Sequence, residues 1–130
     1  MVPSPSLLRI ASAHGLDLVV LFGSRAKGRA RPGSDVDVAA RSRGLLGLRA
    51  RLDVEAALRE TYDADVDLVD LRRADPLLQK QIFSCAQPLF EEPGCFYAAR
   101  LHAFHRYQDY RPFLQMERRA VRRALGLDAH

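Results

Sequence analysis

The sequence predicts a single α/β domain on the strength of three observations. Its 130 residues suffice for one hydrophobic core but not for two. Short runs rich in β-branched and other apolar residues alternate with stretches whose apolar residues recur at helical spacing. A content of 48% hydrophobic and 28% charged residues is ordinary for a soluble globular protein. This composition excludes disordered, collagen-like and disulfide-framework classes.

The first expected elements are a helix and a buried strand. Ser4 and Pro5 precede an apolar stretch and are typical of a helix start, because a hydroxyl caps orphan amides and Pro suits the first turn. The helix is expected to end at His14-Gly15. The run Asp-Leu-Val-Val-Leu-Phe at residues 17–22 predicts a strand that is covered on both faces.

A turn and a second strand follow. Gly23 and Ser24 are expected to end the first strand, and residues 25–29 to add a turn or two of helix. Residues 30–34, which include a Pro and a Gly, are expected to form a loop. Residues 35–40 alternate acidic and apolar side chains, which predicts a strand with one covered face and one face toward polar surroundings.

A loop over residues 41–47 and an amphipathic helix over residues 48–62 come next. The apolar residues that recur at about four-residue spacing predict the buried face of this helix. They are Leu48, Leu52, Ala56 and either Leu58 or its neighbour Arg59.

The remaining chain predicts a third strand and further helices. Residues 63–71 are strand-like, and Asp75-Pro76 is typical of the start of a helix that ends near Phe83. Residues 88–93 are expected to be extended or a turn. A helical extension over residues 95–125 is expected to kink or divide at Pro112.

Three aspartates are the candidate catalytic residues. Asp35 and Asp37 lie two apart on a predicted strand, so their carboxylates share one face about 7 Å apart along the backbone. Unpaired, they would raise each other's pKa, whereas a hard divalent cation would bind them. Asp67 supplies another carboxylate if its strand lies beside the second strand. Three such acids suit two Mg²⁺ ions, about 3.5–4 Å apart, that serve a phosphoryl-type displacement.

The glycine-serine turn provides the complementary anion site. Gly23 lets the backbone approach a ligand closely, and Ser24 adds a hydroxyl donor at the start of a short helix. Positive charge surrounds the same turn at Arg25, Lys27, Arg29 and Arg31. The simplest ligand that needs both phosphate contacts and metal ions is a nucleoside triphosphate.

Together these motifs resemble those of the minimal nucleotidyltransferases of the DNA polymerase beta-like superfamily. The matching positions are Gly23, Ser24, Arg25, Ala26, Gly28, Ser34, Asp35, Asp37 and Asp67. The resemblance covers about residues 7–90 and implies a small mixed sheet flanked by helices, followed by C-terminal helices. The length and the tyrosine-rich C-terminal segment also resemble the stand-alone MntA-type antitoxins of HEPN/MNT toxin–antitoxin systems.

The resemblance implies a role for each matching residue. Asp35 and Asp37 would bind catalytic Mg²⁺, and Asp67 would complete the metal site and help to deprotonate the incoming hydroxyl. Asp65 remains open as the third acid because it shares the face of Asp67. The nucleotide-binding residues would be Gly23, Ser24, Arg25 and Ser34.

The implied activity is Mg²⁺-dependent transfer of AMP from ATP to a tyrosine of a cognate HEPN RNase toxin. A first alternative is a binding antitoxin that neutralises its partner by complex formation alone. A second is nucleotidyl transfer to a small molecule, although related enzymes with that activity carry an extra helical domain that this chain lacks.

Charge and hydropathy limit the kinds of binding partner and the location that the sequence predicts. The net charge is +4 and the pI about 9.5, which permits an anionic partner. Direct nucleic-acid binding is not expected, because no known reading motif is present and the acids would repel a phosphate backbone. No apolar run is long enough to span a bilayer, so a cytoplasmic protein is expected. Residues 100–123 hold seven arginines and form either a solvated face or a docking surface for an acidic partner or RNA.

Overall fold

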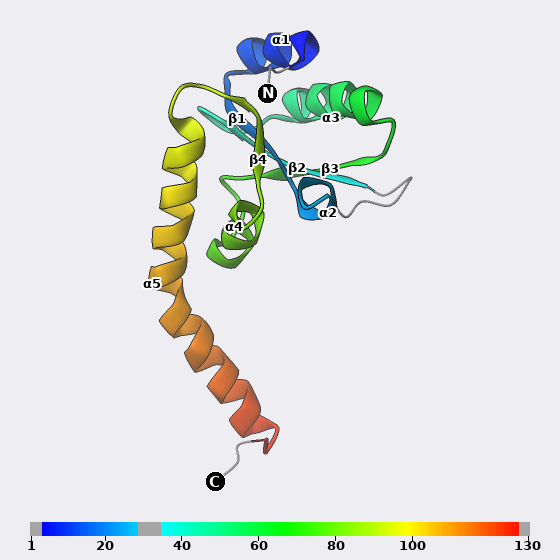
Figure 1. Ribbon diagram of the computed structural model, residues 1–130. Coiled ribbons are helices and arrows are strands. Elements are labelled where there is room, and N and C mark those ends of the chain that lie inside the picture. The colour runs from blue at the N-terminus through cyan, green and yellow to red at the C-terminus, as the bar shows by residue number, and fades with distance from the viewer. Residues whose placement is uncertain (1–3, 29–34, 128–130) are drawn as a thin grey trace.

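The computed structural model describes residues 4–28 and 35–127, in which helices cover both faces of a mixed β-sheet (Figure 1). The elements in chain order are α1 (Pro5–His14), β1 (Leu16–Phe22), α2 (Gly23–Ala26), β2 (Val36–Ser42), α3 (Leu48–Tyr62), β3 (Val66–Asp70), α4 (Pro76–Phe83), β4 (Gln87–Glu91) and α5 (Cys95–Ala124). The implied small mixed sheet flanked by helices is confirmed.

The strands of the described residues pair in the order β3-β2-β1-β4. β1 is antiparallel to both of its neighbours, and β2 is parallel to β3. A parallel pair needs a crossover connection, which α3 supplies between β2 and β3. As a result, β1 and β2 occupy the two central positions, and the residues at their adjoining ends come together.

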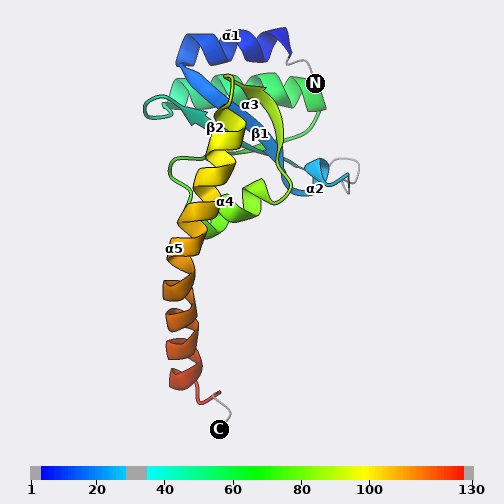
Figure 2. The same ribbon diagram turned by 60° about the vertical axis from the view of Figure 1, so that its left-hand side comes forward.

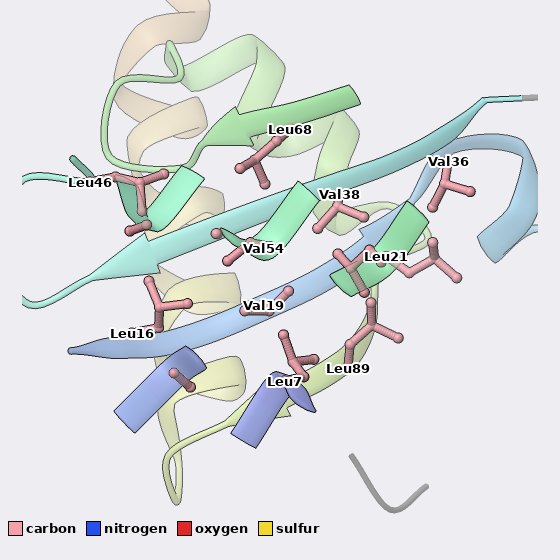
Figure 3. Packing of buried hydrophobic residues seen from close by; sticks show 14 residues of the cluster. Leu7, Leu16, Val19, Leu21, Val36, Val38, Leu46, Val54, Leu68 and Leu89 are labelled. Atoms are coloured by element: carbon pink, nitrogen blue, oxygen red, sulfur yellow. The ribbon is translucent and has the colours of Figure 1, made fainter. Parts of the chain in front are cut away.

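Helices cover the two faces of the sheet in different pairs. α1 and α3 lie on one face, and α4 with the first part of α5 lies on the other (Figures 1 and 2). Val19 of β1 packs in the α1–α3 core with Leu7 and Val54, as Figure 3 shows. Leu18 and Val20 of the same strand pack in the α4–α5 core. The prediction that this strand is covered on both faces is confirmed.

The boundaries of several elements match their sequence signals. Ser4 caps α1 by accepting a hydrogen bond from the Leu7 amide at 3.2 Å, and Gly15 ends it in the left-handed region. Asp75 caps α4 in the same way, with 2.8 Å to the Leu78 amide. Where residues 88–93 were expected to be extended or a turn, residues 87–91 form β4 by pairing with β1. The expected loop at residues 30–34 lies outside the described residues.

The prediction for the buried face of α3 is wrong for Leu48, Leu52 and Ala56 and right for Leu58, one of its two alternatives for the last position. Leu48 and Leu52 are 71% and 51% exposed, whereas the helix buries Ala50, Val54 and Leu58. Both rows repeat every four residues, and a shift of two residues turns the buried side by about 200°. Tertiary contacts set the rotation: the His14 ring nitrogen Nε2 lies 2.8 Å from Asp53 Oδ2.

α5 runs as one helix through Pro112 and changes direction about halfway along (Figure 1). A bend accommodates the missing amide, so the expected kink is found but not a division into two helices. Several apolar side chains of α5 are not packed on the rest of the chain, since Leu101 and Phe104 are 44% and 56% exposed. Among the residues of α5, all of which are described, the buried ones are Ala99 and Ala103. In the described part of the chain, no helix has the length and apolar character needed to cross a membrane.

Replacing a leucine on each side of α3 tests the assignment of its buried face. Leu58→Ala should lower the free energy of unfolding by about 2–5 kcal/mol, because Leu58 is 3% exposed and its loss leaves a cavity. Leu52→Ala makes the same chemical change on the 51% exposed side and should stay within about 0.5 kcal/mol of the wild type. Urea denaturation measures both, and equal losses would contradict the assigned face.

Candidate active site

The turn between β1 and α2 brings the backbone against a carboxylate. Gly23 has φ +74°, in the left-handed region that favours glycine. A Cβ built on Gly23 would overlap Oδ2 of Asp37 and lie 3.1 Å from its Cγ. Phe22, the last residue of β1, pairs in register with Asp37 of β2, which explains this approach. Glycine is therefore required here for two independent reasons.

The sheet register brings two of the candidate acids side by side. Asp37 of β2 and Asp67 of β3 are direct partners in the parallel pairing. The neighbours Val36 and Val38 pack in the α1–α3 core, so alternation places Asp37 on the opposite face. Asp35 comes just before β2, two residues from Asp37, so along an extended chain its side chain would share that face. The prediction that the strand of Asp67 lies beside that of Asp37 is confirmed.

Electrostatics also couple these three acids. Burial raises the pKa of Asp37 above its ordinary value of 3.8, and the nearby charges of Asp67 and Asp35 raise it further. Asp67 and Asp35 are exposed, whereas Asp37 is half-buried. A half-buried carboxylate beside two exposed ones disfavours its own ionised form, which is the situation a bound cation reverses.

The acids are neighbours but are not preassembled into a cage. Among residues 4–28 and 35–127, no three His, Cys, Asp or Glu side chains converge closely enough to hold a metal ion. Mutual repulsion keeps such carboxylates apart when no cation lies between them. A divalent ion would have to draw these side chains together.

Two contacts that the sequence did not reveal anchor α2. The Arg25 guanidinium lies 5.8 Å from the centroid of the Tyr62 ring at the end of α3. Burial raises the pKa of Tyr62, and the Arg25 charge partly opposes this effect. The Gln87 side-chain amide of β4 donates to the Ala26 carbonyl at 2.9 Å. Neither Tyr62 nor Gln87 carries a sequence signal for this role, since each belongs to an element of ordinary composition.

The other predicted nucleotide-binding residues differ in how they are placed. Ser24 is exposed on α2. Ser34, with Arg29 and Arg31, lies outside the described residues. The helix expected at residues 25–29 instead begins at Gly23 and ends at Ala26, so it is a single turn.

A cavity of about 130 Å³ lies elsewhere on the molecule. It is lined by residues of β2, α4 and α5, among them Arg41, Gln79 and Arg106. Arg41 lies at the end of β2 opposite to Asp37 and forms an ion pair with Asp17, with 2.9 Å between Nε and Oδ1. The carboxylate site therefore lies at the other end of the sheet, beside the α2 turn.

Comparison with known proteins identifies the class of enzyme. The family described as "Polymerase beta, Nucleotidyltransferase" matches residues 7–93, which include the α2 turn and all three acids. The chain belongs to this nucleotidyltransferase family.

Individual relatives extend over most of the chain. The protein adenylyltransferase MntA of Shewanella oneidensis is 32% identical over 108 residues, which cover 82% of this chain and 73% of the relative. A crystal structure of a toxin–antitoxin with AMP-PNP matches with a TM-score of 0.70 at 29% identity, covering 92% of this chain and 95% of that chain. A structure of the tri-AMPylated S. oneidensis HEPN toxin in complex with MNT antitoxin matches with a TM-score of 0.63 at 27% identity, covering 92% of each chain.

Gly28 and Gly23 have similar φ angles, so replacing each with alanine distinguishes the cost of backbone strain from the cost of steric overlap. Gly28→Ala should lower the free energy of unfolding by about 1 kcal/mol, because φ is +70° but nothing in residues 4–28 and 35–127 lies within 4 Å of a Cβ. Gly23→Ala should lose at least about 1 kcal/mol more, because its Cβ overlaps the Asp37 carboxylate. Chemical denaturation compares them, and equal losses would show that the close approach is absent.

The raised pKa of Asp37 predicts a pH-dependent gain in stability for Asp37→Asn. The unfolded chain ionises near 3.8 and the folded chain at a higher pH, so the stability of the wild type falls as pH rises through this interval. In the absence of divalent ions, the variant should be more stable than the wild type at pH 7 and equal to it below 3.8. Thermal unfolding across this pH range measures the difference. A variant less stable than the wild type at pH 7 would contradict the assigned repulsion.

Proposed function

We propose that this chain transfers AMP from ATP to a tyrosine of a cognate HEPN toxin and so acts as its antitoxin. The single observation that carries the proposal is the parallel pairing of Asp37 with Asp67, next to the backbone turn at Gly23. Carboxylates beside a turn that accepts phosphates are what triphosphate chemistry requires.

The relatives support the choice of nucleotide and acceptor. The relative with 32% identity is named a protein adenylyltransferase. Matching solved structures hold AMP-PNP, an ATP analogue, or a toxin that carries AMP groups. ATP as the donor and a HEPN protein as the acceptor follow for this chain by similarity.

The donor set fits Mg²⁺, in a site for two ions. Asp35, Asp37 and Asp67 offer carboxylate oxygens, the ligand type that Mg²⁺ prefers. The pKa of Asp37 is raised first by burial and then by the charges of Asp67 and Asp35, which a cation would neutralise. When bound, the ions would neutralise the triphosphate charge and hold attacking and leaving oxygens in line. Asp67 is favoured over Asp65 as the third acid, because Asp67 is the direct register partner of Asp37.

The residues of the chain would mainly position the reactants. Ser24 donates its hydroxyl to the phosphates, and the Gly23 backbone leaves room for them. Arg25 fastens α2 to Tyr62 and places a positive charge beside the turn. Ser34 belongs to the proposed phosphate contacts through its place in the motif.

The transfer itself is an in-line displacement. The tyrosine oxygen forms a bond with the α-phosphorus, and the bond from that phosphorus to the oxygen bridging to the β-phosphorus breaks. Pyrophosphate leaves with the bonding electrons. Asp67 accepts the tyrosine proton as the new bond forms. Alignment and charge stabilisation supply the rate, which is characteristic of this chemistry.

A binding antitoxin without catalysis is the second candidate, and one observation favours it. The part of α5 that follows Tyr107, here called its distal part, carries exposed arginines and exposed apolar residues. Such a helix can hold a partner whether or not transfer occurs.

Removing the acids distinguishes the two candidates. The purified chain, ATP, Mg²⁺ and the HEPN protein encoded by the adjacent gene are mixed, and intact mass spectrometry detects added AMP. Asp35→Asn with Asp37→Asn should reduce the rate of transfer by at least about 100-fold. The same double variant should fail to protect cells from the toxin. Protection that survives without any mass increase in the toxin would favour the binding antitoxin.

A matched pair of single variants tests the choice of third acid. Asp67→Asn should abolish transfer in this assay, whereas Asp65→Asn makes the same change two residues away and should leave it largely intact. The reverse order would assign the third carboxylate to Asp65.

A further inference from the structure

The distal part of α5 extends beyond every element that could cover it in the described chain. α5 meets α4 through Phe96, whose ring centroid lies 5.8 Å from that of Phe83. Lys80 of α4 lies with its Nζ 4.2 Å from the centroid of the Tyr107 ring, and it also lines a hollow with Arg111 and Arg118. Farther along, Phe113 and Val121 are 67% and 52% exposed, and the helix projects away from the sheet (Figures 1 and 2).

The face of α5 that packs on the domain continues past the domain. At 100° per residue, Tyr110, Leu114, Val121 and Leu125 fall within about 80° of the same direction as the buried Ala99 and Ala103. We call these four residues the distal stripe. Tyr110 and Leu114 are half-buried, whereas Val121 and Leu125 are exposed. An inward-facing apolar stripe without a core beneath it is typical of a helix that packs on a partner.

Positive charge follows one side of the distal stripe. Two adjoining hollows run along it: Arg111 and Arg118 line the first, Arg118 and Arg122 the second, and Leu114 lies in both. Arg119 and Arg123 line neither hollow, since they lie more than 100° around the helix from the centre of the distal stripe. Glu117 lines the second hollow as well, so the stripe has an arginine border and one acid within it.

The positive charge of the distal part of α5 also indicates which kind of partner binds the distal stripe. Residues 111–124 carry five arginines and one acid, Glu117, so pairing two copies of this helix would bring like charges together. A partner with an acidic border around an apolar surface would instead gain from the contact. Resting on the proposed function, we infer that the distal stripe docks an acidic, apolar surface of the cognate HEPN toxin.

Docking on α5 would place toxin binding and AMP transfer at different parts of the molecule. The stripe and the carboxylate site belong to different parts of the molecule, so docking would hold the toxin while its tyrosine reaches the acids. Holding the acceptor in this way raises its effective concentration at the site. Loss of the dock should therefore raise the KM for toxin and leave kcat at saturating toxin nearly unchanged.

Two pairs of arginines give a matched experiment. Arg118→Glu with Arg122→Glu should weaken binding of the purified HEPN protein by roughly tenfold or more and raise the KM for transfer in parallel. Arg119→Glu with Arg123→Glu makes the same change of charge on the opposite side and should stay within about twofold of the wild type. Calorimetry gives the Kd, and circular dichroism verifies the helix. Equal effects of the two pairs would overturn the assignment of the surface.

A second pair tests the apolar part. Leu114→Glu should weaken toxin binding, whereas Met116→Glu, at an exposed position outside both hollows, should not. Self-association of the free chain that Leu114→Glu abolishes would overturn the inference by assigning the stripe to a second copy. If the wild type binds the toxin but adds no AMP, the proposed transfer fails and the dock stands. If it adds AMP and all variants bind alike, only the dock fails.

Discussion

The half-burial of Asp37 beside Asp67 and Asp35 is the constraint on which the candidate site depends. Asp37 is half-buried against the Gly23 backbone and beside the carboxylate of its register partner, so its ionised form is disfavoured. A domain of this size keeps such a disfavoured charge in place only where packing holds the surrounding strands rigidly. β1 provides that support, because Leu18, Val19 and Val20 are fully buried between two cores. The site is thus placed where the sheet is packed on both sides.

Much of this site could be predicted because strand geometry depends on local sequence. A spacing of two residues puts Asp35 and Asp37 on one face of any strand, whatever the fold around it. The position of Asp67 required more, because alternation does not say which strands are neighbours. The family motif supplied that expectation, and the parallel pairing of β2 with β3 confirmed it.

Helix orientation was less predictable than strand orientation. In α3, the rows containing Leu52 and Leu58 have the same four-residue repeat, and only contacts with α1 and the sheet decide between them. In the first part of α5, apolar side chains such as Leu101 and Phe104 lie away from the buried Ala99 and Ala103, so the packed face could not be read from the apolar residues there. The Arg25–Tyr62 contact joins elements far apart in the sequence, and no local pattern could have revealed it.

The two parts of α5 meet different physical requirements. The first part must pack on α4 closely, which explains why Ala99 and Ala103 are small and buried. The distal part contributes nothing to the core of the described chain, yet it retains apolar side chains and one arginine-rich border. Ordering so long a helix with exposed apolar residues gains little from this chain alone, because tertiary packing supplies most helix stability. Its composition is therefore best explained by an interaction outside the chain, while the carboxylates and the α2 turn remain a compact chemical unit at the end of the sheet.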